Sequence, residues 1–359
     1  MPTAQAFQAA GHEVLYALGG HVAMAAAAGM AVVDTAPGVD FHQIFRSFFE
    51  HHQQATSGAG DESRARWAAQ LFARVSDMTV DAAVAVATEW KPDVVVHTPL
   101  QGAGRLVASH CGVPAVEHGI GFGSTNVFAG LLRDEMRESY DKYRITEEPP
   151  ATAALEVAPA SMTATEPRLG WPMRYVPYNG GGVLPDWLLP QPARPRIAVT
   201  LGTVLPAMGG LGGLSALLDA AATIDAEFVL ALGEADIASL PTPPGNVRLC
   251  LEWIPLRWLL RTCAGAVHHG GAGTTLTTLD AGIPQLVLPH GADQYINAGA
   301  VQARGVGHIT SPASIGPSDL ERLLTETTTR TAAAQVRSEM AATPAPAELI
   351  SRIAKLVDG

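Results

Sequence analysis

A glycine-rich turn between a strand and a helix constrains this chain more than any other segment. His268-His269-Gly270-Gly271-Ala272-Gly273-Thr274-Thr275 follows a short apolar run, Ala264 to Val267, and leads into a helical pattern from Leu276 to Ala281. The first N–H groups of a helix lack partners within it and lie at the positive end of its dipole. A diphosphate fits there without a metal, and glycine lets the backbone approach the anion. The turn therefore predicts a diphosphate site, in which His269 and Thr274 add hydrogen bonds, although such a turn also joins a strand to a helix without any ligand.

Length, composition and charge narrow the class of protein. The chain has 359 residues, which suits two domains, and its 47% hydrophobic and 16% charged residues allow a large core and argue against global disorder. Its formal net charge of −11 argues against nucleic acid and against an anionic membrane surface as partners.

The sequence also points to a reducing compartment. Its three cysteines, Cys111, Cys250 and Cys263, are far apart and form no metal-binding spacing. The longest apolar run, Val22 to Val33, is too short to span a bilayer, and no signal peptide begins the chain. We therefore expect a cytoplasmic protein.

Apolar strand-like runs alternate with helical patterns, which predicts an α/β fold of two doubly wound domains facing a central cleft. The predicted strands are Glu13–Leu18, Ala31–Asp34, Val94–His97, Ala115–Glu117, Arg196–Leu201, Phe228–Leu232, Val247–Leu251, Gly265–Val267 and Gln285–Leu288. The predicted helices include Pro2–Ala10, Ser63–Glu89, Gly104–Cys111, Leu214–Thr223, Gln294–Gln302 and Ala345–Leu356.

Seven prolines from Pro167 to Pro195, with the run Gly180-Gly181-Gly182 among them, predict a linker between the domains. The boundaries we predict are residues 1–175 for an N-terminal, acceptor-binding domain, 176–195 for the linker and 196–359 for a C-terminal, nucleotide-sugar-binding domain. The last helix is expected to pack back on the N-terminal domain.

Three further loops follow strands of the second domain. Gly202-Thr203 can grip the same diphosphate, or it is an ordinary turn. Trp253-Ile254-Pro255 suits stacking against a nucleobase with backbone groups reading its edge, or Trp253 is a core residue beside a rigid proline. Asp293-Gln294 can hold sugar hydroxyls, or Asp293 caps the next helix.

No Asp-x-Asp pair occurs anywhere in the chain, so a metal-bridged nucleotide-sugar site is not expected. Helix dipoles and hydrogen bonds would neutralise the diphosphate instead. The sequence also lacks a Ser/His/Asp elbow, a Walker loop and a Gly-x-Gly-x-x-Gly turn after the first strand.

These elements together resemble the two-domain, GT-B-type glycosyltransferases (family 1 type) of actinobacterial secondary metabolism. The segments that carry the resemblance are Met173–Gly180, Val199–Val204, Glu252–Leu256 and the run from Val267 through His290-Gly291-Ala292-Asp293-Gln294 to Asn297. Their order and spacing match over nearly the whole chain. Among relatives, the sequence is most similar to enzymes that attach deoxysugars to enediyne (calicheamicin-like) and macrolide antibiotics.

The resemblance implies an inverting, metal-independent transfer of a sugar from a nucleotide diphosphate to an apolar small-molecule acceptor, with no cofactor. Matched residue by residue, it implies diphosphate contacts for Gly202, Thr203 and the turn from His269 to Thr274. It implies base contacts for Trp253 and Ile254, and sugar contacts for Asp293 and Gln294. A homodimer or a helper protein stays open.

Two departures from the family pattern bear on the donor and on the catalytic base. A Gln and a Glu that grip ribose hydroxyls in plant relatives stand here as Leu256 and Thr277, which favours a TDP-sugar over a UDP-sugar. The family begins with a strand and a loop that carries a catalytic His, and this sequence begins at the following proline, Pro2. His12 lies after the first helix, so the base is expected upstream of Pro2.

Other histidines could stand in as the base. His97 and His118 follow strands, but a hydrogen-bonded structural role is the more common one, and His42, His51 and His52 receive no role. Acceptor contacts are expected in the segments 41–57 and 119–132, where Phe45, Phe48 and Phe49 indicate an apolar, aromatic or polyketide acceptor, or a helix core face. Two alternatives remain: a nucleotide-binding relative without activity, and a GT-B-type sugar-nucleotide epimerase, which the linker and the sugar loop disfavour.

Overall fold

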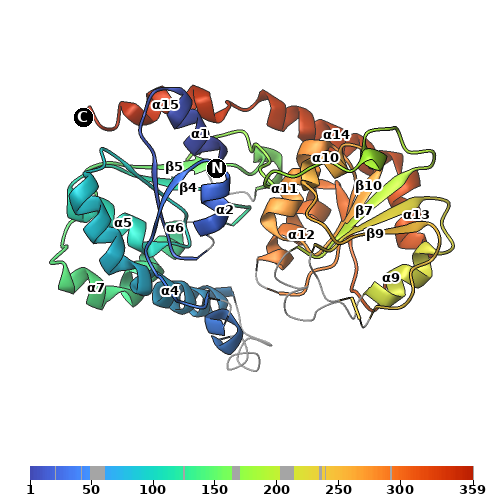
Figure 1. Ribbon diagram of the computed structural model, residues 1–359, viewed down its shortest axis with the longest axis horizontal. Helices are drawn as coiled ribbons and strands as arrows, with labels where there is room; N and C mark the ends of the chain where they lie inside the picture. The colour runs from blue at the N-terminus through green and yellow to red at the C-terminus, as the bar shows by residue number, and fades with distance from the viewer. Residues whose placement is uncertain are drawn as a thin grey trace.

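The computed structural model describes residues 1–20, 22–41, 43–48, 61–123, 126–163, 170–202, 214–233, 237–238, 240–291 and 293–358. They form two α/β domains that lie side by side (Figure 1). Each has parallel strands with helices around them, so the predicted fold class is confirmed.

The C-terminal domain contains a parallel sheet of six strands in the order β12-β11-β10-β7-β8-β9. The strands are β7 (Arg196–Thr200), β8 (Glu227–Ala231), β9 (Val247–Cys250), β10 (Gly265–His268), β11 (Gln285–Val287) and β12 (Gly307–Ile309). Every residue of β7 and β10 is buried, as expected for central strands covered on both faces. The helices are α9 (Leu214–Ala221), α10 (Leu256–Leu260), α11 (Ala272–Ala281), α12 (Gln294–Arg304), α13 (Pro317–Thr325) and α14 (Thr327–Ala342).

The N-terminal domain differs from the expected single doubly wound sheet. One parallel pair consists of β1 (Leu15–Leu18) and β2 (Ala31–Asp34). A separate parallel sheet has the order β3-β4-β5-β6, with β3 (Val95–His97), β4 (Ala115–His118), β5 (Thr152–Glu156) and β6 (Trp171–Pro172). The helical elements are α1 (Pro2–Ala9), α2 (Val22–Ala27), α4 (Asp61–Trp90), α5 (Gly102–Cys111), α6 (Asn126–Glu135), α7 (Arg137–Lys142) and η1 (Ala160–Met162).

The two N-terminal sheets end at the same place on α4. A methyl group on Gly19, just after β1, would lie 2.8 Å from Cγ2 of Thr79, and Gln101, after β3, donates to Oγ1 of Thr79 at 3.4 Å. Among the described residues no backbone ladder joins β1 to β3, so the strands of this domain form two separate sheets.

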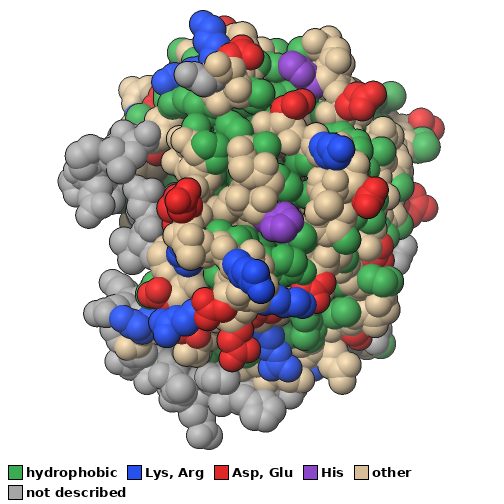
Figure 2. Space-filling view, turned by 90° about the vertical axis from the view of Figure 1, so that its left-hand side faces the viewer, with side chains coloured by type: hydrophobic (Ala, Val, Ile, Leu, Met, Phe, Trp, Pro, Cys, Tyr) green, Lys and Arg blue, Asp and Glu red, His purple; other side chains and the backbone are tan. Residues whose placement is uncertain are grey.

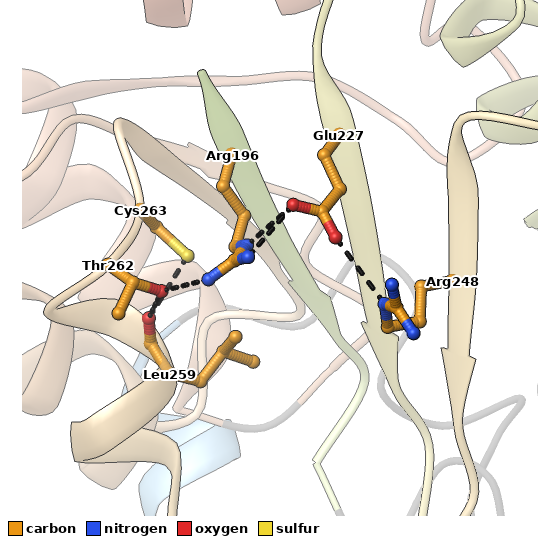
Figure 3. Close-up of polar contacts among 6 residues, drawn as sticks. All are labelled: Arg196, Glu227, Arg248, Leu259, Thr262 and Cys263. Atoms are coloured by element: carbon orange, nitrogen blue, oxygen red, sulfur yellow. Dashed lines mark hydrogen bonds and ion pairs between the residues drawn. The ribbon is translucent and has the colours of Figure 1, made fainter. Parts of the chain in front are cut away.

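A buried arginine fixes the end of the linker to the C-terminal sheet. Arg196 begins β7 and pairs with Glu227 of β8 at 2.9 Å, while its guanidinium also donates to Thr262 (Figure 3). The ring of Trp187, in the short helix η2 (Asp186–Leu188), lies 5.2 Å from the guanidinium of Arg196 and 4.8 Å from that of Arg248. Residues around Trp187 therefore pack with the C-terminal domain.

The chain crosses between the domains twice, and the two crossings touch. The N–H of Arg174, after β6, donates to the carbonyl of Pro344, after α14, at 2.8 Å. Beyond Pro344, α15 (Pro346–Ala354) packs on α1 of the N-terminal domain, and α14 and α15 together run along both domains (Figure 1). Arg352 of α15 lies over the ring of Trp171 at 3.8 Å.

Charges of both signs mix on the surface of the N-terminal domain. Figure 2 shows basic side chains next to acidic ones on the face at the left of Figure 1. Ion pairs in this domain include Arg105 with Glu148 at 2.7 Å and Lys142 with Asp81 at 2.6 Å. The three cysteines are free thiols. None of the helices in the described part of the chain is long and apolar enough to cross a membrane.

Candidate functional site

The predicted glycine-rich turn joins β10 to α11 and is supported by a hydrogen bond to the side chain of His268. This side chain is completely buried; its Nδ1 accepts from the N–H of Gly270 at 3.1 Å, and its Nε2 lies 2.7 Å from Oε1 of Gln285. Burial lowers the pKa of His268 to about 3, so the ring is neutral and donates to Gln285. The first histidine of the motif is therefore a structural support of the turn.

The N-terminus of α11 opens from this turn. Gly271 occupies the N-cap position, and its carbonyl accepts the N–H of Thr275 at 2.9 Å. The N–H groups of Ala272, Gly273 and Thr274 precede that bond, so they have no acceptor within the helix. They provide the donors and the positive dipole end that an anion requires.

His269 lies between the two predicted diphosphate loops. A methyl group on Gly202, whose φ is +70°, would approach Cε1 of the His269 ring to 2.6 Å, and Gly271 packs against the same ring edge. Both positions therefore require glycine. Gly202 follows β7, and β7 pairs with β10, so the sheet brings the two loops together as predicted. Thr203 lies outside the described residues.

Electrostatics keep His269 neutral. Burial lowers its pKa to about 4, and nearby His290 acts in the same direction, while Asp293 and the backbone of Thr200 oppose the shift. Among the described residues, none forms a hydrogen bond of normal geometry with the buried Nδ1 of His269. A neutral imidazole with one N–H can donate to a phosphate oxygen.

Asn297 ties the sugar loop to the diphosphate turn, a role that the sequence analysis missed. Its buried side chain donates to the carbonyl of Gly270 at 2.8 Å and to Oδ2 of Asp293 at 2.9 Å. The only signal in the sequence was its place at the end of the family motif.

The structure separates the two roles considered for Asp293. This residue precedes α12 at the N-cap position, but its side chain makes no capping hydrogen bond. It is exposed and accepts only from Asn297 among the described residues. Gln294 uses Oε1 to accept the N–H groups of His290 (2.8 Å) and Gly291 (3.3 Å), which leaves its NH₂ group to donate.

Trp253 is not a core residue. Its side chain is 47% exposed, and its Nε1 donates to the carbonyl of Asn179 in the linker at 2.8 Å. The side chain of Ile254 is buried in the core of the domain, so only its backbone is left to contact a base. A base contact by Ile254 stays a prediction, and it would be made by the main chain, as the sequence analysis expects.

Thr277, where the sequence analysis aligns the ribose-binding Glu of plant relatives, lies beside Tyr175. Thr277 is buried and donates to the carbonyl of Gly273. The hydroxyl of Tyr175, from the domain crossing, donates to the same carbonyl at 3.2 Å and lies 3.3 Å from Oγ1 of Thr277. Leu256 begins α10 and is half-buried.

The N-terminal domain reaches this site through the loop after β4. A methyl group on Gly121 would lie 2.9 Å from Cβ of Ala272, so the loop touches the first turn of α11. Both ring nitrogens of His118 have partners, Oγ1 of Thr3 at 2.8 Å and the carbonyl of Gly119 at 2.9 Å. His97 contacts the carbonyl of Thr98 at 3.1 Å through Nδ1. His42, His51 and His52 lie outside the described residues.

The site as a whole can hold an anion, a flat base and a polyol next to one another. Within the described ranges, no three His, Cys, Asp or Glu side chains gather in a way that could hold a metal ion. Two facing α/β domains with this arrangement define a GT-B-type glycosyltransferase.

Comparison with known proteins identifies the family. The model of erythromycin biosynthesis protein CIII-like N-terminal domains matches residues 5–202, and that of the C-terminal domains matches residues 215–356. The chain belongs to this family of glycosyltransferases.

Individual relatives agree with the family. The chain is 38% identical to elloramycin glycosyltransferase ElmGT of Streptomyces olivaceus over 98% of its own length and 92% of that protein. The structure matches the glycosyltransferase SnogD from Streptomyces nogalater with a TM-score of 0.87 and 43% identity, covering 99% of this chain and 94% of that one. It matches SsfS6 of Streptomyces sp. SF2575, complexed with thymidine diphosphate, with a TM-score of 0.82 and 28% identity, over 99% and 94% of the two chains.

Proposed function

We propose that this chain transfers a deoxysugar from a TDP-sugar to a hydroxyl group of a natural-product aglycone. The observation that carries the proposal is the meeting of the α11 N-terminus, the neutral ring of His269 and the N-terminal-domain loop at Gly121. A donor diphosphate bound there lies next to the N-terminal domain, which is expected to bind the acceptor. Thymidine diphosphate in SsfS6, and the spinosyn aglycone in the spinosyn rhamnosyltransferase SpnG, support this choice of substrates.

The surroundings of Thr277 support thymidine over uridine. A carboxylate at this position would be free to bind ribose hydroxyls. The hydroxyl of Thr277 instead donates to the carbonyl of Gly273 and lies against Tyr175. A deoxyribose, which has one hydroxyl fewer, loses less from the absence of that carboxylate.

The chemistry we propose inverts the anomeric centre without a metal. A base removes the proton of the acceptor hydroxyl, whose oxygen attacks the anomeric carbon from the face opposite the diphosphate. The bond from that carbon to the diphosphate oxygen breaks, and its electron pair leaves on the phosphate. The N–H groups at α11 and the ring of His269 donate to the charge that develops there, and Asp293 with Gln294 orients a sugar with oxocarbenium character.

Binding of TDP in the presence of EDTA tests the donor half of this proposal. We expect titration calorimetry to show binding by the full chain, weakened about 10- to 100-fold in His269→Ala, as for the loss of a hydrogen bond to a charged group. His308→Ala is the matched control. His308 lies on β12, outside the site, and its Nε2 is 2.6 Å from a carboxylate oxygen of Glu326. Binding that needs a divalent metal, or equal losses in the two variants, would contradict the proposal.

Nucleotide binding without transfer is the second candidate. The engagement of both nitrogens of His118 favours it, because this histidine is then not free to act as a base. Release of TDP from TDP-sugars over a panel of hydroxylated acceptors separates the two candidates. Acceptor-dependent release supports transfer, and tight TDP binding without release supports the second candidate.

A further inference from the structure

Aromatic side chains gather at one place in the N-terminal domain. Phe45 packs edge-to-face on Phe72 with ring centroids 6.1 Å apart, and Phe72 does the same with Phe128 at 6.3 Å. Phe48 lies beside Trp67 at 4.8 Å. The rings come from three separate segments, residues 43–48, α4 and α6, and we call them the aromatic cluster.

The aromatic cluster stands at the edge of the domain that faces the donor site. The helical residues 43–48 follow Phe41, whose ring fills the space beside Gly19 and Gly20 at the carboxyl end of β1. Phe128 lies in the first turns of α6, which follows β4 through the loop where Gly121 touches Ala272. The cluster is therefore on the same edge as the loop that meets the diphosphate turn.

Its aromatic composition differs from that of the buried core against which Phe72 and Phe128 pack. The buried core between α4, α5 and α6 is largely aliphatic, with Val80, Val84 and Leu106 among its members. The five rings of the cluster are only partly buried. Four of the chain's nine phenylalanines, Phe45, Phe48, Phe72 and Phe128, belong to this cluster. Rings that keep part of their surface exposed leave a face or an edge for another π-system.

We propose that the acceptor carries a planar, polycyclic aromatic ring system, and that Phe45, Phe72 and Phe128 form the wall it packs against. This inference rests on the proposed function and specifies its acceptor class. A flat aromatic ligand matches the ring quadrupoles of the cluster, whereas a puckered aliphatic ring of the same size fills space without that match. Phe72 contacts both of the other rings, so its replacement is expected to disturb the whole wall.

Direct binding of two probes to the full chain, without donor, tests the proposal. The probes are alizarin (1,2-dihydroxyanthraquinone) and testosterone, an aliphatic tetracycle of similar size that also carries a hydroxyl. We expect calorimetry to show tighter binding of alizarin, weakened about three- to tenfold in Phe72→Leu. Testosterone binding as tight as that of alizarin, or alizarin binding that Phe72→Leu leaves unchanged, would overturn the proposal.

Controls separate this outcome from a folding defect and from failure of the proposed function. Phe7→Leu also removes a ring, in the buried cluster on the other side of the domain, and is expected to leave alizarin binding unchanged. Equal losses in Phe7→Leu and Phe72→Leu would assign the aromatic cluster a purely structural role. TDP affinity is measured in parallel. If Phe72→Leu keeps its TDP affinity but loses alizarin binding, the defect lies in the acceptor wall. If the wild-type chain does not bind TDP, the result counts against the proposed function alone.

Discussion

The indole nitrogen of Trp253 donates a 2.8 Å hydrogen bond to the main-chain oxygen of Asn179, 74 positions earlier in the chain. The side chain of the same asparagine accepts the N–H of Arg257 at 3.0 Å. One linker residue thus fixes both the ring and the first turn of α10, while about half of the indole stays exposed.

Replacing Trp253 tests its stacking role. Trp253→Ala is expected to weaken TDP binding by about 1 to 3 kcal/mol, the usual contribution of base stacking on an aromatic ring. Trp253→Phe keeps a ring but loses the bond to Asn179, so a smaller loss is expected. The control is Trp258→Ala, because Trp258 is 51% exposed on α10 and lies against Arg261. Calorimetry that finds Trp258→Ala as damaging as Trp253→Ala would remove the stacking role.

The carboxylate of Asp293 is free of a capping bond, and this predicts a kinetic effect without a stability effect. Asp293→Asn should leave the melting temperature nearly unchanged and TDP affinity intact, but raise KM for the TDP-sugar. Asp319→Ala should do the reverse, because it removes the carboxylate oxygen that accepts the N–H of Gly316 at 2.9 Å at the start of α13. A lower melting temperature in Asp293→Asn with normal KM would make Asp293 a helix cap.

The hydroxyl of Tyr175 links a domain crossing to the first turn of α11. In Tyr175→Phe the bonds to Gly273 and Thr277 are lost, so we expect a loss of about 1 kcal/mol in unfolding free energy and faster hydrogen exchange at α11. Tyr178→Phe serves as the comparison, since Tyr178 is 38% exposed in the same segment. Unchanged exchange at α11 in Tyr175→Phe would exclude the link.

Stability should fall in mild acid because two histidines are buried as neutral rings. Burial lowers the pKa of His268 to about 3 and of His269 to about 4, from an ordinary value of 6.5. Below pH 6.5 the unfolded chain binds protons that the folded chain does not, so unfolding free energy decreases as the pH falls toward 4. For the fully buried His268 the slope is about 1.4 kcal/mol per pH unit.

Urea unfolding at pH 7 and pH 5.5 checks this slope. His268→Asn is the informative variant, because its side-chain oxygen can still accept from Gly270 but does not titrate. It should be less stable than the wild type at pH 7 and lose less between the two pH values. Equal losses in both proteins would show that His268 does not set the acid sensitivity.

The sequence was most informative where strands are buried on both faces. Arg196–Leu201 and Gly265–Val267 were predicted to within one residue of β7 and β10, because continuous apolar runs leave no other arrangement. By contrast β5, β6 and β12 went unpredicted: β5 is partly exposed and rich in alanine, and the others have two or three residues.

The candidate site shows the same limit. Loops that follow strands could be read from motif order, which gave Gly202, His269 and the α11 turn. The supports could not, because Tyr175 and Gly273 are 98 positions apart, and Asn297 and Gly270 are 27 apart. Such pairs are created by the fold, and one sequence alone carries no trace of them.

The bond between Arg174 and Pro344 has a mechanical consequence. Because the two chain crossings are hydrogen-bonded to each other, we expect the domains to rotate about this point more readily than they slide past each other. Such a rotation is expected to open or close the contact between Gly121 and Ala272.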